Sequence, residues 1–337
     1  MAYSTINKYS DHFNTKLFTG NASADNAITG VGFQPDWVWL KDRVGTNNHS
    51  LYDFVRGVTK ALRTSTNGAE TTTSGVTAFG ADGFTVGDNA MGNAANAMVA
   101  WCWKAANGAG SSNTDGSINS TVSVNTTAGF SIVSYTGTGS QATVGHGLGA
   151  VPKMIIIKRL QNTEDWAVYH ASNGAGTYQS LNTTEAKQTN ANRFNVAPTN
   201  QVFTVNTHES VNYAENYIAY CFAEISGYSK FSSYTGNGDA DGAFVYTGFR
   251  PTMVICKRTS AADPWVIMDS KREGYNVANY QLVADTNGAE SSNVRADLLS
   301  NGFKARSGSG EVNDGTYIYM AFGQPIISNS GVCATAR

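Results

Sequence analysis

The side chains with the greatest chemical potential in this chain are five histidines and four cysteines. The histidines stand at positions 12, 49, 146, 170 and 208, and the cysteines at positions 102, 221, 256 and 333. A zinc site needs pairs of such residues at short, regular spacing, and a general base needs a partner within hydrogen-bond distance. The sequence holds no Cys-x-x-Cys pair, nucleophile elbow, P-loop or Rossmann glycine pattern. We therefore expect no catalytic residue, no cofactor, no disulfide framework and reduced structural thiols.

One turn has the oxygen ligands with which a calcium loop begins. Asn237, Asp239 and Asp241 occupy alternate positions, as the first ligands of such a loop do. The twelfth position is Gly248, where a bidentate glutamate belongs, and the matching turn at residues 138–140 has no carboxylate. The pattern favours a polar hairpin turn, and Asp239 and Asp241 are kept only as weak metal candidates.

The sequence contains three copies of one repeated unit, which sets the positions of these residues in the fold. A Phe/Tyr-Thr-Gly string begins at positions 18, 135 and 234, and a proline six residues ahead of a lysine occurs at 35, 152 and 251. The pentapeptide Thr66–Glu70 returns letter for letter as Thr286–Glu290. Because the anchors keep their order, we predict three homologous units. They cover residues 13–105, 129–226 and 227–326, with a Gly/Ser/Asn/Thr-rich linker over 106–128 and a tail over 327–337.

Each unit has the pattern of a β-structure. Apolar runs of five to seven residues, rich in Val, Ile, Tyr, Phe and Trp, alternate with Asn-Gly and Asp-Gly pairs that suit tight hairpin turns. Strict alternation is lost only briefly after Asp53 and Asp269, where a short helical turn is expected. The predicted fold is therefore all-β, with three tandem antiparallel β-sandwiches of jelly-roll type.

The tryptophan pairs allow two interpretations. Trp37 with Trp39, and Trp101 with Trp103, each share one face of a strand, where they could stack on sugar rings. The other units have Met, Ile, Tyr and Phe in these positions, as exchangeable core residues do. Core packing is the favoured interpretation.

A lysine ends the proline-led strand of each unit, at positions 41, 158 and 257. Three equivalent cations could bind an acidic sugar or a carboxylate, whereas a lysine at a strand end also discourages edge-to-edge pairing. The second interpretation is favoured. His170 occupies the position of Asp53 and Asp269, an exchange that predicts a surface or turn site.

The composition of the chain argues against some classes of binding partner. The chain has 23 basic and 25 acidic residues, a net charge of −2 and no run of Lys or Arg, so nucleic acid is not an expected partner. No apolar run approaches the roughly 20 residues of a membrane span, and the first residues lack the apolar core of a secretory signal. Ligand affinity is expected in long variable loops such as Asn173–Asn195 and Arg272–Asn279.

Several strings together resemble an uncharacterised repeat domain found in virion proteins of marine tailed bacteriophages. They are Gly-Phe-x-Pro at 32–35, Tyr-Thr-Gly-x-Gly at 135–139, Ala-Tyr-Cys-Phe-Ala-Glu at 219–224, Gly-Tyr-Ser-Lys-Phe at 227–231 and the string at 243–249. The resemblance extends from near Phe13 to the carboxy terminus and carries no established binding residues.

The resemblance implies a non-enzymatic structural protein on the virion surface, made in the host cytoplasm without a signal peptide. A tail-associated, fibre-like or receptor-binding component that serves host adhesion is the first expectation. A capsid decoration protein on the outside of the head is the second, and a lectin-like module or glycan-active enzyme is the third. The expected partners are tail or major capsid proteins and a host surface glycan or receptor, with several copies per virion or a homo-oligomer.

Overall fold

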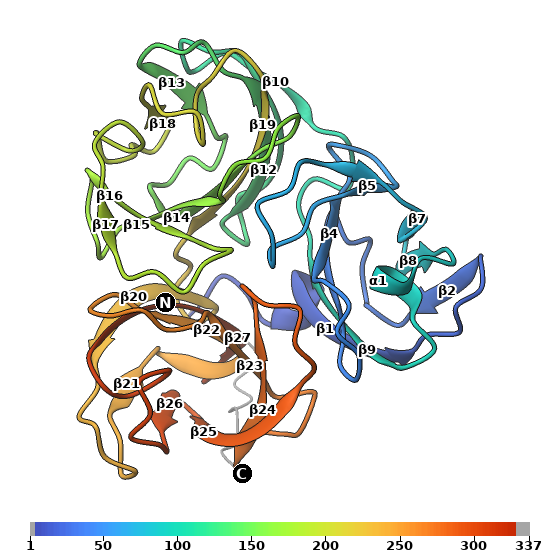
Figure 1. Cartoon of the computed structure of the whole chain (residues 1–337), viewed down its shortest axis with the longest axis vertical. Helices are drawn as coiled ribbons and strands as arrows, with labels where there is room; N and C mark the ends of the chain where they lie inside the picture. The colour runs from blue at the N-terminus through green and yellow to red at the C-terminus, as the bar shows by residue number, and fades with distance from the viewer. Residues whose placement is uncertain (1–3, 328–337) are drawn as a thin grey trace.

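The computed structural model describes residues 4–327 and is built almost entirely of antiparallel β-strands. The prediction of an all-β fold is confirmed. Figure 1 shows three lobes around a common centre. All named strand pairs lie within one lobe, so the first lobe is defined by β1 to β9, the second by β10 to β19 and the third by β20 to β27.

The first lobe combines a four-stranded sheet, a three-stranded sheet and a short two-stranded pair. Its strands are β1 (Phe13–Thr19), β2 (Asn26–Thr29), β3 (Trp37–Asp42), β4 (Ser50–Asp53), β5 (Lys60–Ala61), β6 (Thr71–Thr72), β7 (Val76–Gly80), β8 (Gly83–Val86) and β9 (Ala97–Trp103).

The second lobe has an eight-stranded sheet and a separate pair, β13 with β18. Its strands are β10 (Ser111–Asn113), β11 (Ser120–Asn125), β12 (Phe130–Thr136), β13 (Ala142–Gly145), β14 (Pro152–Arg159), β15 (Ala167–His170), β16 (Thr177–Ser180), β17 (Gln188–Thr189), β18 (Val202–Val205) and β19 (Asn216–Ala223). The predicted linker over 106–128 is wrong, because it contains β10 and β11. Backbone pairing to β12 makes this polar tract an edge of the sheet.

The third lobe is a single eight-stranded sheet that curls back on itself. Its strands are β20 (Ser229–Thr235), β21 (Phe244–Tyr246), β22 (Phe249–Arg258), β23 (Val266–Asp269), β24 (Ala278–Val283), β25 (Ser291–Leu299), β26 (Gly302–Ala305) and β27 (Thr316–Pro325).

One strand order appears in all three lobes. It reads β1-β9-β3-β4 in the first, β12-β19-β14-β15 in the second and β20-β27-β22-β23 in the third. The strands that follow Pro35, Pro152 and Pro251 therefore hold equivalent interior places. The register agrees as well, since Trp37 lies opposite Trp103 as Met154 lies opposite Phe222 and Met253 opposite Phe322.

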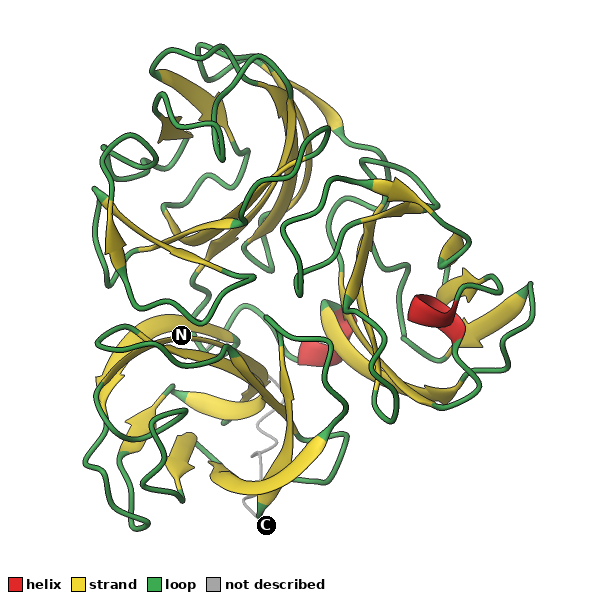
Figure 2. Cartoon of the chain, in the orientation of Figure 1, coloured by secondary structure: helices red, strands yellow, loops and turns green. Residues whose placement is uncertain are grey.

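Helix is almost absent from the described residues. One short helix, α1 (Ala90–Asn93), lies in the first lobe, and a 3-10 turn, η1 (Tyr9–Asp11), lies between the first lobe and β27 of the third (Figure 2). The segments after Asp53 and Asp269 form hydrogen-bonded turns rather than named helices. Within residues 4–327 no helix has the length and apolar character needed to cross a bilayer.

Both faces of the recurring sheets are buried, which explains why all six residues of β3 are inaccessible. Val38 and Leu40 pack into a core that belongs to the first lobe alone. Trp37 and Trp39, on the opposite face, pack into a central core to which all three lobes contribute. The second and third lobes have their own outer cores in the same way. Burial on both sides explains the unbroken apolar run from Trp37 to Leu40.

The glycine of each Thr-Gly string is required by a close backbone approach. A Cβ on Gly20 would lie 1.9 Å from the Ala94 carbonyl oxygen, and one on Gly137 would lie 2.1 Å from that of Tyr213. No side chain fits at such distances. The motif therefore recurs because it lets a loop pass directly over the end of the first strand.

Candidate functional site

The centre of the molecule is filled by aromatic rings. Phe322 lies with its ring centroid 5.9 Å from that of Trp103 and 6.0 Å from that of Phe222, and Trp37 lies 4.4 Å from Trp103. Trp103, Phe222 and Phe322 are equivalent residues of β9, β19 and β27. The four tryptophans singled out in the sequence are all at most 1% exposed, which confirms core packing. No sugar can reach these rings.

Around this core the lobes meet at three interfaces, each closed by an equivalent backbone hydrogen bond. We call them the first–second, second–third and third–first interfaces. In the first–second interface the Glu70 N–H donates to the Leu160 carbonyl at 2.8 Å. In the second–third interface the Lys187 N–H donates to the Thr259 carbonyl at 3.1 Å. In the third–first interface the Glu290 N–H donates to the Arg43 carbonyl at 2.8 Å. The third lobe therefore contacts the first as the first contacts the second, and the chain forms a closed ring with approximate threefold symmetry.

A buried side chain crosses each interface from one equivalent position. Trp166 donates its indole N–H to the Arg63 carbonyl at 2.8 Å, and Trp265 donates to that of Ser180 at 2.9 Å. His49 takes this position in the first lobe. Its ring accepts a hydrogen bond from the Trp39 indole at 2.8 Å and lies beside the Val283 carbonyl, and burial lowers its pKa well below the ordinary value.

The three repeated lysines are buried, so the prediction that they discourage edge pairing is wrong. Lys158 donates to the Asn67 carbonyl across the first–second interface, and Lys257 donates to that of Thr184 across the second–third interface. Lys41 binds the carbonyls of Asp42 and Gly45 within its own lobe. Burial lowers the pKa of each lysine to about 8. They act as internal donors to backbone oxygens, and none is placed for an acidic ligand.

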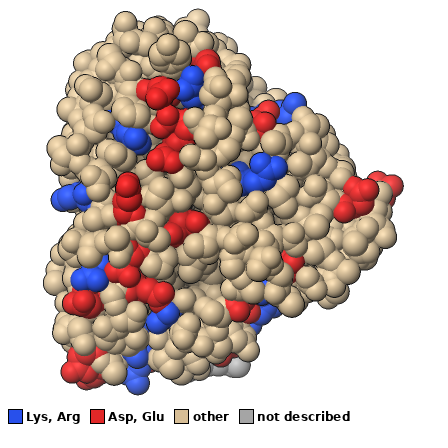
Figure 3. Space-filling view, in the orientation of Figure 1, with Lys and Arg blue, Asp and Glu red and all other residues tan. Residues whose placement is uncertain are grey.

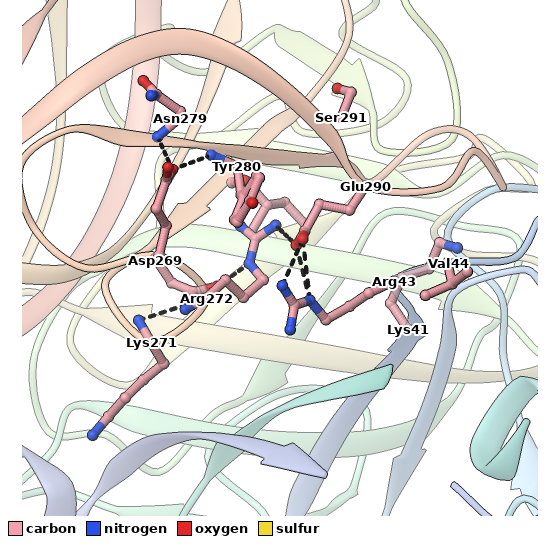
Figure 4. Close-up of polar contacts among 12 residues, drawn as sticks. Lys41, Arg43, Val44, Asp269, Lys271, Arg272, Asn279, Tyr280, Glu290 and Ser291 are labelled. Atoms are coloured by element: carbon pink, nitrogen blue, oxygen red, sulfur yellow. Dashed lines mark hydrogen bonds and ion pairs between the residues drawn. The ribbon is translucent and has the colours of Figure 1, made fainter. Parts of the chain in front are cut away.

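An ion cluster closes the third–first interface (Figure 4). Arg272 is fully buried and pairs with Asp269 at 2.6 Å and with Glu290 at 2.9 Å. From the first lobe Arg43 reaches Glu290 at 2.6 Å, and the Trp101 indole donates to Asp269 at 3.1 Å. Two cations and two carboxylates balance each other, so the desolvated charges are compensated.

The first–second interface repeats this arrangement with three charges. Arg56 pairs with Asp53 at 2.5 Å and with Glu70 at 2.9 Å, and the Tyr220 hydroxyl donates to Asp53 at 2.8 Å. Burial alone would lower the pKa of Arg56, but the charges of Asp53, Tyr220 and Glu70 raise it overall. Arg56 thus stays protonated in the interior.

The second–third interface differs, because His170 stands where the others have an aspartate. Its side chain is buried at 1% exposure, so the surface position expected from the sequence is wrong. The ring donates to the Tyr319 carbonyl at 3.3 Å and accepts the Ser172 N–H at 3.2 Å. Burial lowers the pKa of His170 to about 4. The histidine is therefore a neutral structural residue with both nitrogens in use.

The two loops proposed for ligand affinity lie partly inside the interfaces. In the segment 173–195, the Thr184 carbonyl and the Lys187 amide bond to the third lobe. The segment 272–279 starts with the buried Arg272 and is held by Glu273, which accepts the backbone N–H of Asn279 at 2.6 Å. Part of each segment therefore serves ring closure.

The weak metal candidates form a turn held by a buried asparagine. Asn313 donates to the side chain of Asn237 at 2.7 Å and to the Asp239 carbonyl at 2.6 Å. Asp239 accepts the Asp241 N–H, and the Asp241 carboxylate pairs with Lys304 at 2.6 Å. Among residues 4–327 no three His, Cys, Asp or Glu side chains converge as a metal group. The turn is held by bonds to Asn313 and Lys304, and Asp241 is largely exposed.

Cys102, Cys221 and Cys256 are free, buried thiols, and burial raises the pKa of each. Cys333 lies outside the described residues. His12, His146 and His208 stand apart and accept hydrogen bonds in turns and loops, with burial lowering their pKa values.

The residues that close the ring were not among the candidates predicted from the sequence. Arg56 and Arg272 gave no signal alone, but each follows its aspartate by three residues. The repeated pentapeptide ends at Glu70 and Glu290, which pair with these arginines. The identical pentapeptides, each ending in a glutamate, were the signal in the sequence that both glutamates have an equivalent buried arginine as partner.

Charge on the face seen in Figure 3 is sparse. Asp and Glu side chains gather in a band that runs from the second lobe into the third. No comparable field of Lys and Arg appears on this face, so it is unsuited to a polyanion such as nucleic acid.

The fold and its interfaces agree with the extent of the family match. A family model described as Domain of unknown function (DUF7483) matches residues 8–325. The chain belongs to this family. The matched range includes all three lobes, so the family domain corresponds to the whole three-lobed unit and not to a single lobe. No curated protein and no solved structure shows significant similarity to the chain.

Proposed function

We propose that this protein is a non-enzymatic structural component of a tailed bacteriophage particle, exposed on its surface and associated with the tail. Its task in this proposal is attachment to the host. The observation that carries the proposal is ring closure within one chain. Equivalent interfaces and a common aromatic core join the three lobes into one body.

A rigid body that presents its binding surface in one conformation is suited to attachment. A binding surface that is ordered before contact loses little conformational entropy when it meets a receptor. The buried charges and lysines of the interfaces are used for assembly of the ring, which leaves the outward loops and outer sheet faces for recognition. The strings that resemble virion proteins supply the particle context.

Capsid decoration is the second candidate, and the symmetry of the ring favours it. A chain with three related faces about one axis can make three similar contacts on a partner that has a threefold axis. Such axes occur on an icosahedral head as well as on a trimeric tail component. The two candidates differ in the partner and not in the fold.

Particle composition tests the proposal directly. Particles purified from a culture that carries the gene should contain the chain by mass spectrometry, and a reconstruction should show a three-lobed body on the tail. Density on the head would select capsid decoration. Absence of the chain from purified particles would overturn both candidates.

An adsorption assay tests attachment. Micromolar purified chain, added to host cells before the phage, should slow phage adsorption by occupying the receptor, while a heat-denatured sample should not. An unchanged adsorption rate with natively folded chain would contradict a role in attachment.

A further inference from the structure

Two aromatic side chains stand exposed on the outer edge of the third lobe. Phe244 is 48% exposed and Tyr246 is 59% exposed, while Val245 between them is buried. They occupy β21, which is the edge of the eight-stranded sheet and pairs with β26. Alternation along a strand places the two rings on one outward face, about 7 Å apart along the chain.

The fold does not require these rings. Val245 lies opposite Phe303 as Val144 lies opposite Phe203 and Ile28 opposite Phe84, which fixes the equivalent positions. The residues that correspond to Phe244 and Tyr246 are therefore Ala27 with Thr29 in the first lobe and Thr143 with Gly145 in the second. Two of three lobes make this edge with small residues, so the exposed rings of the third lobe have a use outside folding.

Two glycines lie beside the rings. Gly302 lies opposite Tyr246 across the strand pair. A Cβ at this glycine would lie 2.1 Å from the Val245 carbonyl oxygen and 3.1 Å from the Phe244 ring, so no side chain fits at this position. Gly248 lies on the other side, where a Cβ would be 3.6 Å from the Tyr246 hydroxyl.

Charged groups border the rings and neutralise one another. Lys304, which lies opposite Phe244, pairs with Asp241 at 2.6 Å. Arg306 lies 3.4 Å from Asp297 and 3.9 Å from Asp241. Asp241 is 80% exposed and Arg306 41% exposed, so both still present hydrogen-bonding atoms to solvent. The border offers donors and acceptors without net charge.

We propose that Phe244, Tyr246 and this charged border form a binding site for a neutral glycan. A pyranose ring presents one apolar face of C–H groups, which packs on an aromatic ring, and a rim of hydroxyls that both donate and accept hydrogen bonds. The balanced border is complementary to an uncharged ligand and would leave an acidic sugar without a free cation. A three-residue edge strand offers few backbone bonds to an added strand, which argues against a peptide or a second copy.

The inference names the receptor class for the proposed attachment function and takes its biological context from that proposal. The chemistry of the site is independent of the particle. Binding can therefore fail while the chain is found in virions, or succeed while it is not, so the two failures are distinguishable.

Titration of the full chain with defined oligosaccharides tests the site. The probes are the hexaoses of cellulose, starch and laminarin and a mannohexaose, with an alginate hexamer as the acidic comparison, followed by calorimetry or saturation-transfer NMR. We expect at least one neutral probe to bind and the acidic probe to bind at least about tenfold more weakly, a difference of about 1.4 kcal/mol.

Variants assign the binding to the rings. Phe244→Ala and Tyr246→Ala should each weaken binding about tenfold, and Phe244→Tyr should retain it. Tyr213→Ala, at a 52% exposed tyrosine of the second lobe, is the matched control and should leave affinity unchanged. Melting curves of the Phe244 and Tyr246 variants should match the wild type, because these rings are not in the core.

Three results would overturn the inference. They are no neutral probe bound at millimolar concentration by the folded wild type, equal affinity of the wild type and both alanine variants, and a wild-type dimer in sedimentation that both alanine variants dissociate. The last result would assign the rings to contact between copies.

Discussion

At the first–second interface the Asp53 carboxylate accepts the Tyr220 hydroxyl, whereas at the second–third interface the equivalent residues are His170 and Met320. The residues around this position also differ between the two lobes. Arg56 and Glu70 of the first lobe correspond to Asn173 and Lys187 of the second. Instead of an ion pair, Asn173 donates to Gln179, which donates to the Arg258 carbonyl at 3.1 Å.

The difference follows from donors and acceptors that must be satisfied in the interior. Tyr220 and Trp101 bring a donor into their interfaces and meet an aspartate in both cases. Met320 brings none, and the residue opposite is a histidine that donates to the Tyr319 carbonyl instead. Buried polar groups need partners, so both members of the pair change together. The backbone bonds are kept at every interface, and the side-chain chemistry varies.

Loss of one partner from the buried ion cluster is expected to have the largest effect. Asp53→Ala leaves Arg56 buried without its closest carboxylate and removes the acceptor of Tyr220. It should lower the free energy of unfolding by about 3–5 kcal/mol, measured by urea denaturation. Asn173→Ala, which removes the neutral residue at the position of Arg56 in the second–third interface, should cost under about 1 kcal/mol. Equal losses would show that the two interfaces do not differ in energy as their contacts suggest.

The second largest expected effect is the loss of stability of the second–third interface, which contains His170, in acid. The pKa of His170 is about 4 in the folded chain, below its ordinary value near 6.5, so the folded protein disfavours the charged ring. The stability present above pH 6.5 is lost as the pH falls from 6.5 through 4, because the unfolded chain binds the proton first. The loss should be about 3 kcal/mol, and His170→Gln should abolish it.

Burial also lowers the pKa of His49, which adds to the loss of stability in acid. The measured quantity is therefore the difference in free energy of unfolding between wild type and His170→Gln at each pH. Hydrogen exchange should place the acid-induced opening at β15 and β27. An identical pH profile for His170→Gln would refute this assignment.

The buried lysines give the smallest expected effect and are common to both interfaces. Lys257→Met removes the donor to the carbonyls of Thr184 and Asp263 and should cost about 2 kcal/mol. Lys60→Met, at a more exposed lysine of β5, is the control and should cost less than about 0.5 kcal/mol. Thermal unfolding at neutral pH measures both. A Lys257→Met chain as stable as the control would mean that water replaces the lysine.

Local pattern was sufficient for the secondary structure. Alternating apolar runs and turn pairs encode strands directly, so β3, β14 and β22 were found in order behind their prolines. Residues 106–128 were misjudged because polar residues dominate this tract and β11 has only Val122 and Val124 as apolar residues. Backbone pairing to β12 makes that strand, and pairing does not depend on side-chain polarity.

The functional positions were harder to predict. Lys41, Lys158 and Lys257 were recognised as a repeated feature, but their burial was not, because a lysine in sequence is ordinarily a surface residue. The exposed pair Phe244 and Tyr246 was hidden for the opposite reason. In sequence it reads as part of an apolar strand, and only exposure separates it from Val245.

What the amino-acid sequence by itself determined is the all-β class, the strand order along the chain and the repetition of its anchors. These depend on residues close together in sequence, through strand propensity, alternation and turn geometry. Only the tertiary structure decided that the lobes form a closed ring. Arg43 and Glu290 are 247 residues apart yet pair directly, and each inner sheet buries one face in its own lobe and the other in the core shared by all three lobes. Long-range contacts of this kind are set by the burial of complementary surfaces, which leaves no periodic trace in the local sequence.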